Sequence, residues 1–274
     1  MVVLGGSVVA GLLGSLTGLG GGIVIVPLLT LVLHIDVRYA IGASIVSVIA
    51  TSSAAAATYA REGFTNLRLA MFLEVATTLG AVVGATVATF LPTQTIALVF
   101  GVFLLFSGVQ SMKPREPKDR LTPDQASDAA KRLRLTSEFP GADGAPVRYG
   151  LTGVPAGFAF MALAGGLSGM LGIGSGGFKV LAMDSVMKVP FKVSTTTSNF
   201  MIGVTAAASA SVYLVRGYIE PRIAAPVVLG VLVGASIGTR LLMRWSSHSV
   251  RIVFAVLLML LGAYMTWSAA HNPV

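Results

Sequence analysis

Long apolar stretches separated by short polar breaks run along nearly the whole chain. They cover residues 2–33, 41–60, 67–90 and 95–112, followed by 151–187, 195–215, 222–241 and 249–269. A helix needs about 20 residues to cross the hydrocarbon core of a bilayer. The last three stretches of each group are therefore predicted to be one transmembrane helix each. The pattern predicts an all-α integral membrane protein.

The first stretch of each group is longer than one crossing requires, and a glycine cluster interrupts it. The clusters lie at Gly18 to Gly22 and at Gly172 to Gly177. We expect two helical pieces joined by an irregular turn at each cluster. The two pieces could form a re-entrant hairpin or a single broken span, and the sequence does not decide between them.

An internal repeat relates the two groups of stretches. The segment from Gly11 to Gly22 aligns with the segment from Gly165 to Gly176 at an offset of 154 residues, and the same offset matches Arg68 to Arg222. Transporters are often built from two such copies. The predicted organisation is a first membrane repeat at 1–112, a soluble linker at 113–149 and a second membrane repeat at 150–274.

Composition and charge support this class and exclude others. Hydrophobic residues make up 54% of the chain and charged residues 11%, against about 25% in ordinary soluble domains. Of the 30 charged residues, 14 lie in the linker, where eight are basic and six acidic. The basic residues outside the linker flank apolar segments, which argues against a nucleic-acid partner and for a lipid bilayer. The linker itself is predicted to be cytoplasmic, with a short helix capped by Thr122.

Positive charge also favours one relative orientation of the halves. If the first stretch of each half returns to its starting side, the halves are inverted, and five of seven informative basic residues join the linker inside. Parallel halves would reverse this count. We therefore expect inverted halves, with Lys188 and Lys192 on the linker side and the uncharged loop Leu91 to Thr95 on the other.

The glycine clusters are the first candidate for a binding site. Gly172 to Gly177 matches G-x-G-x-x-G but lacks the strand and helix context of a dinucleotide site. Close helix packing of small residues is one explanation. The other is that a broken helix exposes backbone N–H groups to an anion near the membrane midplane. On that hypothesis the substrate-binding glycine-cluster residues are Gly20, Gly21, Gly22, Gly174, Ser175, Gly176 and Gly177.

Hydroxyl-rich segments follow both clusters and supply further candidate donors. They contain Ser44 in the first half and Thr197, Ser198 and Asn199 in the second, and Ser44 aligns with Ser198. Hydroxyls in membrane helices also cap or bond back to the helix backbone, so a structural role is the alternative.

Three ionisable residues lie inside predicted membrane stretches, where charge is costly and commonly functional. Lys179 follows the second glycine cluster and replaces Ile25 of the first half, so it is a candidate anion ligand. A structural ion pair with Asp184 is the alternative. Glu74 is a candidate for proton coupling, or it lies near the membrane interface.

An enzyme is not expected from the inventory of reactive residues. The three histidines lie at segment ends or at the C-terminus, and Ser175 lacks the G-x-S-x-G context of a nucleophile. No metal-ligand cluster and no cofactor motif are evident. An intramembrane enzyme is therefore the weakest alternative.

Together, the glycine segments ending in Pro27 and Phe178, the Ala-Ser-Ile and Thr-Thr-Ser-Asn stretches after them, and the eight-segment double repeat resemble the sulfite exporter TauE/SafE family. The resemblance implies a multi-pass inner-membrane carrier of small sulfur-containing anions, such as sulfite, sulfoacetate or other organosulfonates, driven by ion gradients. The expected function is secondary transport by alternating access, with protons as a candidate coupling ion. A passive anion channel of the same fold is the main alternative, and a homo-oligomer stays open.

Overall fold

The computed structural model describes residues 2–17, 21–61, 63–112, 121–141, 145–174, 176–242 and 247–271. Helices dominate this part of the chain, which confirms the all-α prediction. The first half contains α1 (Val2–Thr17), α2 (Gly22–Pro27), the π-helix η1 (Leu28–Val32), α3 (Val37–Arg61), α4 (Leu67–Phe90) and α5 (Thr93–Met112). The second contains α7 (Val154–Leu171), α8 (Gly176–Leu181), the π-helix η3 (Ala182–Val186), α9 (Phe191–Val215), α10 (Pro221–Leu242) and α11 (Ser247–His271).

The same offset seen in the sequence relates the elements of the two halves. The pairs α2 and α8, η1 and η3, and α3 and α9 begin and end at positions 154 residues apart. Each first stretch is indeed divided into two helical pieces at its glycine cluster, as predicted.

Both π-helices end in the same sharp turn. His34 and Lys188 occupy equivalent positions and adopt positive φ values of 51° and 57°. The next residue in each half closes the turn, because Ile35 N–H donates to the Leu29 carbonyl and Val189 N–H to that of Met183. Pro27 has no proline counterpart in the second half, since Leu181 takes its place, so proline alone does not cause the π-turns.

The helices pack crosswise between the halves. α1 packs along α10, α7 along α4, and α5 along α11, while α3 and α9 lie against each other. Glycines permit the closest approaches: a Cβ on Gly11 would lie 2.4 Å from the Val231 carbonyl oxygen, and one on the equivalent Gly165 would lie 2.1 Å from that of Thr77. Gly11 and Gly165 thus allow α1 to approach α10, and α7 to approach α4, at close range.

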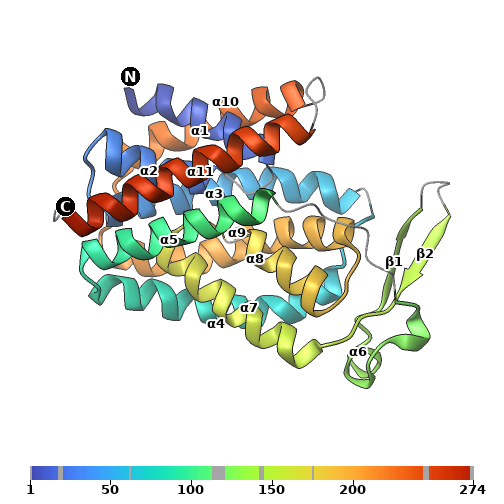
Figure 1. The fold of residues 1–274 in the computed structure, drawn as a ribbon. Helices are drawn as coiled ribbons and strands as arrows, with labels where there is room; N and C mark the ends of the chain where they lie inside the picture. The colour runs from blue at the N-terminus through green and yellow to red at the C-terminus, as the bar shows by residue number, and fades with distance from the viewer. Residues whose placement is uncertain are drawn as a thin grey trace.

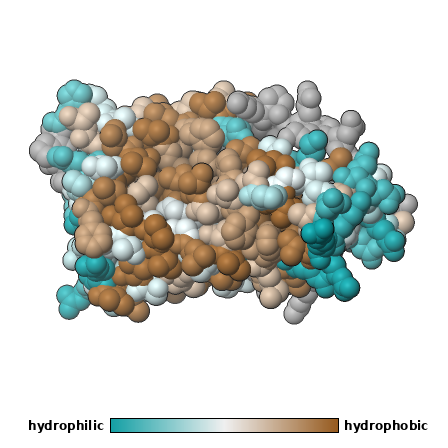
Figure 2. Space-filling model, turned by 90° about the horizontal axis from the view of Figure 1, so that it is seen from below, coloured by the Kyte–Doolittle hydropathy of each residue, from teal (hydrophilic) through white to brown (hydrophobic). Residues whose placement is uncertain are grey.

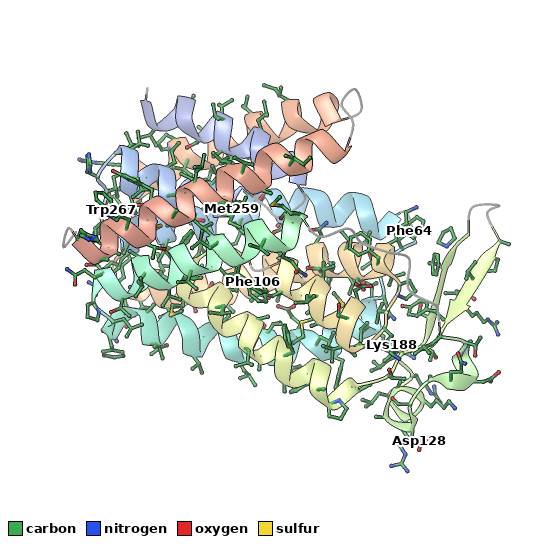
Figure 3. The ribbon with its side chains drawn as sticks, in the orientation of Figure 1. Phe64, Phe106, Asp128, Lys188, Met259 and Trp267 are labelled. Carbon is green, nitrogen blue, oxygen red and sulfur yellow. The ribbon has the colours of Figure 1, made fainter. Side chains whose placement is uncertain are left out.

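The loops gather at two opposite ends of the molecule. At one end the linker meets the α3–α4 loop and the segment before α9: Asn66 Nδ2 donates to the Leu135 carbonyl, and Thr152 N–H to that of Met187. At the other end Arg38 donates to the Leu91 carbonyl and stacks over Tyr218. Lys188 lies near the linker and Trp267 at the far end (Figure 3).

This placement fits the inverted arrangement of the halves. α1 and α2 double back, so α3 starts from the end where α1 starts, and α7 and α8 do the same from the linker end (Figure 1). Lys188 shares an end with the linker, and Leu91 lies at the other. Which end faces the cytoplasm remains a prediction.

The linker contains more structure than the predicted short helix. Thr122 and Gln125 form a capping box around a 3₁₀ turn, and α6 (Asp128–Arg132) follows. The sequence analysis missed an antiparallel hairpin of β1 (Ser137–Pro140) and β2 (Pro146–Tyr149). Tyr149 at its end accepts a hydrogen bond from Asn66, and burial raises the pKa of Tyr149 to about 12. The hairpin and α6 thus dock on the α3–α4 loop.

The surface matches a multi-pass membrane protein. Figure 2 shows hydrophobic side chains over the middle of the molecule and hydrophilic ones at both ends. Within the described residues, α4, α5, α7 and α9 are long and apolar enough to cross a membrane. Their exposed faces carry large apolar side chains such as Met71, Leu163 and Leu214. Such faces suit contact with lipid.

Candidate functional site

The second glycine break is a tight backbone turn between α7 and α8. Gly172 and Gly174 adopt φ values of 67° and 71°, a region that side chains other than glycine rarely enter. A Cβ on Gly172 would also lie 2.7 Å from Ile41 Cγ2. These two glycines are therefore required by the break itself.

Of the predicted residues, Gly20 in the first break and Ser175 in the second lie outside the described part of the chain.

Hydroxyl groups join the two breaks at the centre of the molecule. Ser44 Oγ contacts the carbonyl oxygens of Gly172 and Gly22, at 2.7 Å and 3.3 Å. The equivalent Ser198 donates to the carbonyl of Gly176 at 3.1 Å. Both serines thus lie at the breaks, and they direct their protons to backbone carbonyls of the protein.

An equivalent pair of apolar side chains fills the space between the breaks. Val48 of α3 lies against Gly22 and Gly174, and Ile202 of α9 lies against Gly174 and Gly176. The first break is also close to α10, since a Cβ on Gly21 would approach Val231 Cγ1 at 3.0 Å. The glycines of both breaks therefore share one central, tightly packed region.

Lys179 is the charged residue at this region. It lies on α8 two residues after Gly177, and its side chain is fully buried, with 0% exposed. Its Nζ donates to Thr205 Oγ1 on α9 at 2.5 Å. Thr205 is the hydrogen-bond partner of the ammonium among the described residues. An ammonium group has three donors, so this contact does not saturate it.

Glu74 of α4 completes a three-residue chain with Lys179 and Thr205. Thr205 Oγ1 lies 2.7 Å from Glu74 Oε1, so the ammonium and the carboxylate are no more than about 5 Å apart. Thr78 also donates to Oε1, at 3.3 Å. The second oxygen, Oε2, is buried and has no hydrogen-bond partner among the described residues. The carboxylate therefore faces neighbouring helices, and whether Glu74 lies near the membrane interface stays a prediction.

The ion-pair alternative for Lys179 names the wrong partner. Asp184 lies in η3 and is half-buried, whereas the ammonium turns to Thr205 on a different helix. The five-residue separation along α8 and η3 suggested a loose pairing. The tertiary contact with α9 instead places the lysine beside a carboxylate from the first half of the chain.

The remaining predicted donors, Thr197 and Asn199, differ in their contacts with the described part of the chain. Thr197 Oγ1 accepts from the backbone N–H of Asn66, so this residue helps to fix the α3–α4 loop at the linker end. Asn199 is half-buried, and its amide has no hydrogen-bond partner among the described residues. Thr197 is thereby separated from the glycine breaks, although it neighbours Ser198 in sequence.

Aromatic side chains hold the opposite side of α8. Phe178 stacks on Phe106 with ring centroids 5.1 Å apart and also contacts Phe103 and Phe160. These partners belong to α5 and α7, and Phe106 is marked near the middle of the molecule in Figure 3. α8 is therefore anchored by Phe178 on one side and by Lys179 on the other.

A pocket of about 70 Å³ lies away from this site, at the end opposite the linker. It is lined by Thr30, His34, Thr93, Tyr264 and Ser268, together with neighbouring apolar residues. The fully buried Lys179 and the buried Oε2 of Glu74 are better evidence for a site than this small surface hollow, because buried charge must be compensated.

Thr205 is the residue that the sequence analysis missed. Its signal is a stripe of hydroxyls on one face of α9, since Ser198 and Thr205 lie seven residues apart, two helical turns. Ser209 follows after another turn, and all three are buried. The stripe alone does not reveal that Glu74 lies opposite it.

Comparison with known proteins agrees with this architecture. The family described as "Sulfite exporter TauE/SafE" matches residues 3–265. A "Probable membrane transporter protein YunE" of Bacillus subtilis is 27% identical, over 99% of this chain and 98% of its own length. Two further proteins named probable membrane transporters, from Xylella fastidiosa and Methanocaldococcus jannaschii, are 25% and 24% identical, over 97% and 94% of this chain and 95% and 91% of their own lengths. No solved structure matches. The family match spans nearly the whole chain, both repeats included, and the chain belongs to the sulfite exporter TauE/SafE family.

Proposed function

We propose that this protein is a secondary transporter that moves a small sulfur-containing anion, such as sulfite, sulfoacetate or another organosulfonate, across the inner membrane by alternating access. The observation that carries the proposal is Lys179, a fully buried cation beside the second glycine break. The family description directs the proposal toward sulfur-containing anions.

A buried lysine suits an anion that must leave water and cross the membrane. The cost of burying an ammonium is offset only when a negative group stands near it. Glu74 supplies that group through Thr205 in this structure. An anion that entered the region of Gly176 and Gly177 would find the unsaturated donors of Lys179 within a site already built to hold charge.

The test is anion binding by the purified protein. Sulfite, thiosulfate, sulfoacetate, taurine and carboxylate analogues would be titrated into wild type, Lys179→Ala and the matched control Ile25→Ala. We expect Lys179→Ala to lose affinity more than tenfold and Ile25→Ala to keep it, since Ile25 is the uncharged equivalent in the first half. Normal affinity in Lys179→Ala would remove this residue from the site.

A passive anion channel of the same fold is the alternative function. The two are separated in proteoliposomes loaded with the anion that binds. A coupled carrier accumulates the anion against its gradient and stops when an ionophore collapses the proton gradient. Flux that is insensitive to the ionophore and never exceeds equilibrium would establish the channel.

The proposed orientation places the linker, Lys188 and Lys192 in the cytoplasm. Single cysteines at exposed positions would test it in this cysteine-free chain: Arg132→Cys in the linker, Lys188→Cys before α9 and Pro92→Cys between α4 and α5. An impermeant thiol reagent added to whole cells should label only Pro92→Cys. Labelling of the other two instead would reverse the orientation.

A further inference from the structure

The chain Lys179–Thr205–Glu74 has a consequence for how transport is driven. We infer that Thr205 links an anion on Lys179 to a proton on Glu74, so that the anion and the proton bind together and cross the membrane in the same direction. This inference rests on the proposed function and adds to it the positioning residue Thr205 and the direction of coupling.

Charge balance is the first argument. In the empty site the positive Lys179 and the negative Glu74 cancel. A monovalent anion on Lys179 would leave the site with a net negative charge in a buried region, which costs several kcal/mol. One proton taken from solution by the Glu74 carboxylate restores neutrality, with the proton bound to a carboxylate oxygen. The anion-loaded site and the empty site are then both neutral.

Hydrogen bonding at Thr205 is the second argument. Its hydroxyl has one proton, and it accepts from Lys179. Two close acceptors compete for that proton, Glu74 Oε1 at 2.7 Å and the Met201 carbonyl at 2.9 Å, and a third, Thr77 Oγ1, lies at 3.5 Å. With Glu74 ionised, the proton is directed to Oε1. With Glu74 protonated, the carboxyl can donate to Thr205, and the hydroxyl turns to Met201. The residue therefore has one arrangement for each protonation state of Glu74.

The free oxygen of Glu74 is the third argument. Oε2 is buried without a hydrogen-bond partner among the described residues. A buried carboxylate oxygen without a donor is costly when ionised. This favours uptake of a proton as soon as the anion draws Lys179 away from the carboxylate.

Other charged groups on the elements around Glu74 have separate partners or positions. α7 contains no titratable residue. Arg68 on α4 donates to the Arg134 carbonyl, and Lys192 on α9 lies 4.0 Å from the Phe64 ring centroid, both at the linker end.

The other titratable groups on the surrounding elements are Tyr213, whose hydroxyl donates to the Met170 carbonyl, and Asp184 in η3. Lys179 is therefore the charged partner that reaches Glu74 through Thr205.

The experiment measures anion binding against pH with methanesulfonate, a monovalent sulfonate that does not titrate between pH 5 and 8. Calorimetry in buffers of different ionisation enthalpy counts the protons taken up. For wild type we expect about one proton per anion, and an affinity that rises up to about tenfold for each pH unit lowered. Glu74→Gln should bind without proton uptake and without a pH dependence.

Variants of Thr205 separate its role from simple packing. Thr205→Val removes the hydroxyl at nearly the same volume and should reduce proton uptake at least threefold, whereas Thr205→Ser should keep it. Thr51→Val changes the equivalent residue of the first half and should leave the proton count unchanged. If Glu74→Gln does not fold, the contrast between Thr205→Val and Thr205→Ser still decides.

The outcomes distinguish the inference from the proposed function. No binding of methanesulfonate by wild type at any pH would contradict the proposed organosulfonate transport. Binding without proton uptake, or equal uptake in Thr205→Val and wild type, would overturn the linkage while leaving transport intact. In proteoliposomes, an inward proton gradient should drive anion accumulation, and accumulation driven by an outward gradient would overturn the shared direction.

Discussion

The two glycine breaks are followed by the same series of helical elements but differ in chemistry. In both halves a six-residue helix and a π-turn follow the break, and a serine from the next helix donates to the first carbonyl of the short helix. Yet Ile25 of the first half stands where Lys179 stands in the second, and it is just as fully buried. Both halves therefore contain a break, but only the second break has a buried lysine beside it.

The partners of these two residues differ in the same way. At the repeat offset Glu74 corresponds to Val228 and Thr205 to Thr51. Thr51 donates only within its own helix, to the carbonyls of Ser47 and Val48. Thus only one of the three positions keeps its residue type in the uncharged copy. The two halves share a repeated scaffold, and Lys179 together with Glu74 makes one of its two breaks a charged site.

The largest effect is expected from placing a charge in the uncharged break. Ile25→Lys buries an ammonium where Val228 offers no carboxylate, and an uncompensated buried charge costs about 3–5 kcal/mol. We expect little folded protein by size-exclusion chromatography in detergent. Adding Val228→Glu should recover part of the yield, because Thr51 is already in place. Ile25→Met is the control, and an equally low yield for it would show that packing, not charge, is limiting.

Removing the charge from the charged break should make stability depend on pH. Lys179→Met leaves Glu74 without its counter-charge, so the folded state favours the protonated carboxyl and gains stability as pH falls. We expect the midpoint of thermal unfolding of this variant to rise by several degrees between pH 8 and pH 5, relative to wild type. Adding Glu74→Gln should abolish that difference. If the pH dependence of the midpoint is unchanged by Glu74→Gln, a group other than Glu74 causes it.

The two breaks should also differ in their tolerance of a methyl group. A Cβ on Gly22 would lie 2.7 Å from both Ser44 Oγ and Val48 Cγ2, whereas one on Gly176 would meet the flexible end of Ile202 at 2.8 Å. Gly22→Ala should therefore cost about 1–3 kcal/mol, and Gly176→Ala less than about 1 kcal/mol. Thermal unfolding of both variants in the same detergent measures this difference, and equal losses would contradict it.

The smallest effect concerns the two serines. Ser44 contacts carbonyls of both breaks, whereas Ser198 contacts only that of its own half. Ser44→Ala leaves the buried Gly172 carbonyl without this donor and should cost about 1–2 kcal/mol, against about 1 kcal/mol for Ser198→Ala. The same unfolding assay applies, with Ser47→Ala as a control, since Ser47 donates only within α3. A larger loss for Ser198→Ala would show that the second break depends more on its serine.

Much of the helical architecture follows from local sequence. Apolar stretches of sufficient length located the helices, and α4 begins and ends where its stretch does. The glycine clusters marked both breaks, and at the second one the positive φ of Gly172 and Gly174 requires glycine. The hairpin of β1 and β2 was missed, because its two strands have only four residues each and lack a periodic apolar pattern.

The candidate site was predicted one residue at a time, not as a set. Buried ionisable residues are costly in hydrocarbon, so Lys179 and Glu74 stand out in any apolar sequence, and the repeat shows that each replaces an apolar residue. Their partnership depends on α8 and α4 both reaching Thr205 on α9. No local sequence pattern predicts this contact, because it forms only when helices from opposite halves pack against each other. Composition and periodicity thus specify a broken-helix membrane protein, and the packing of α4, α8 and α9 decides which of its buried charges lie together.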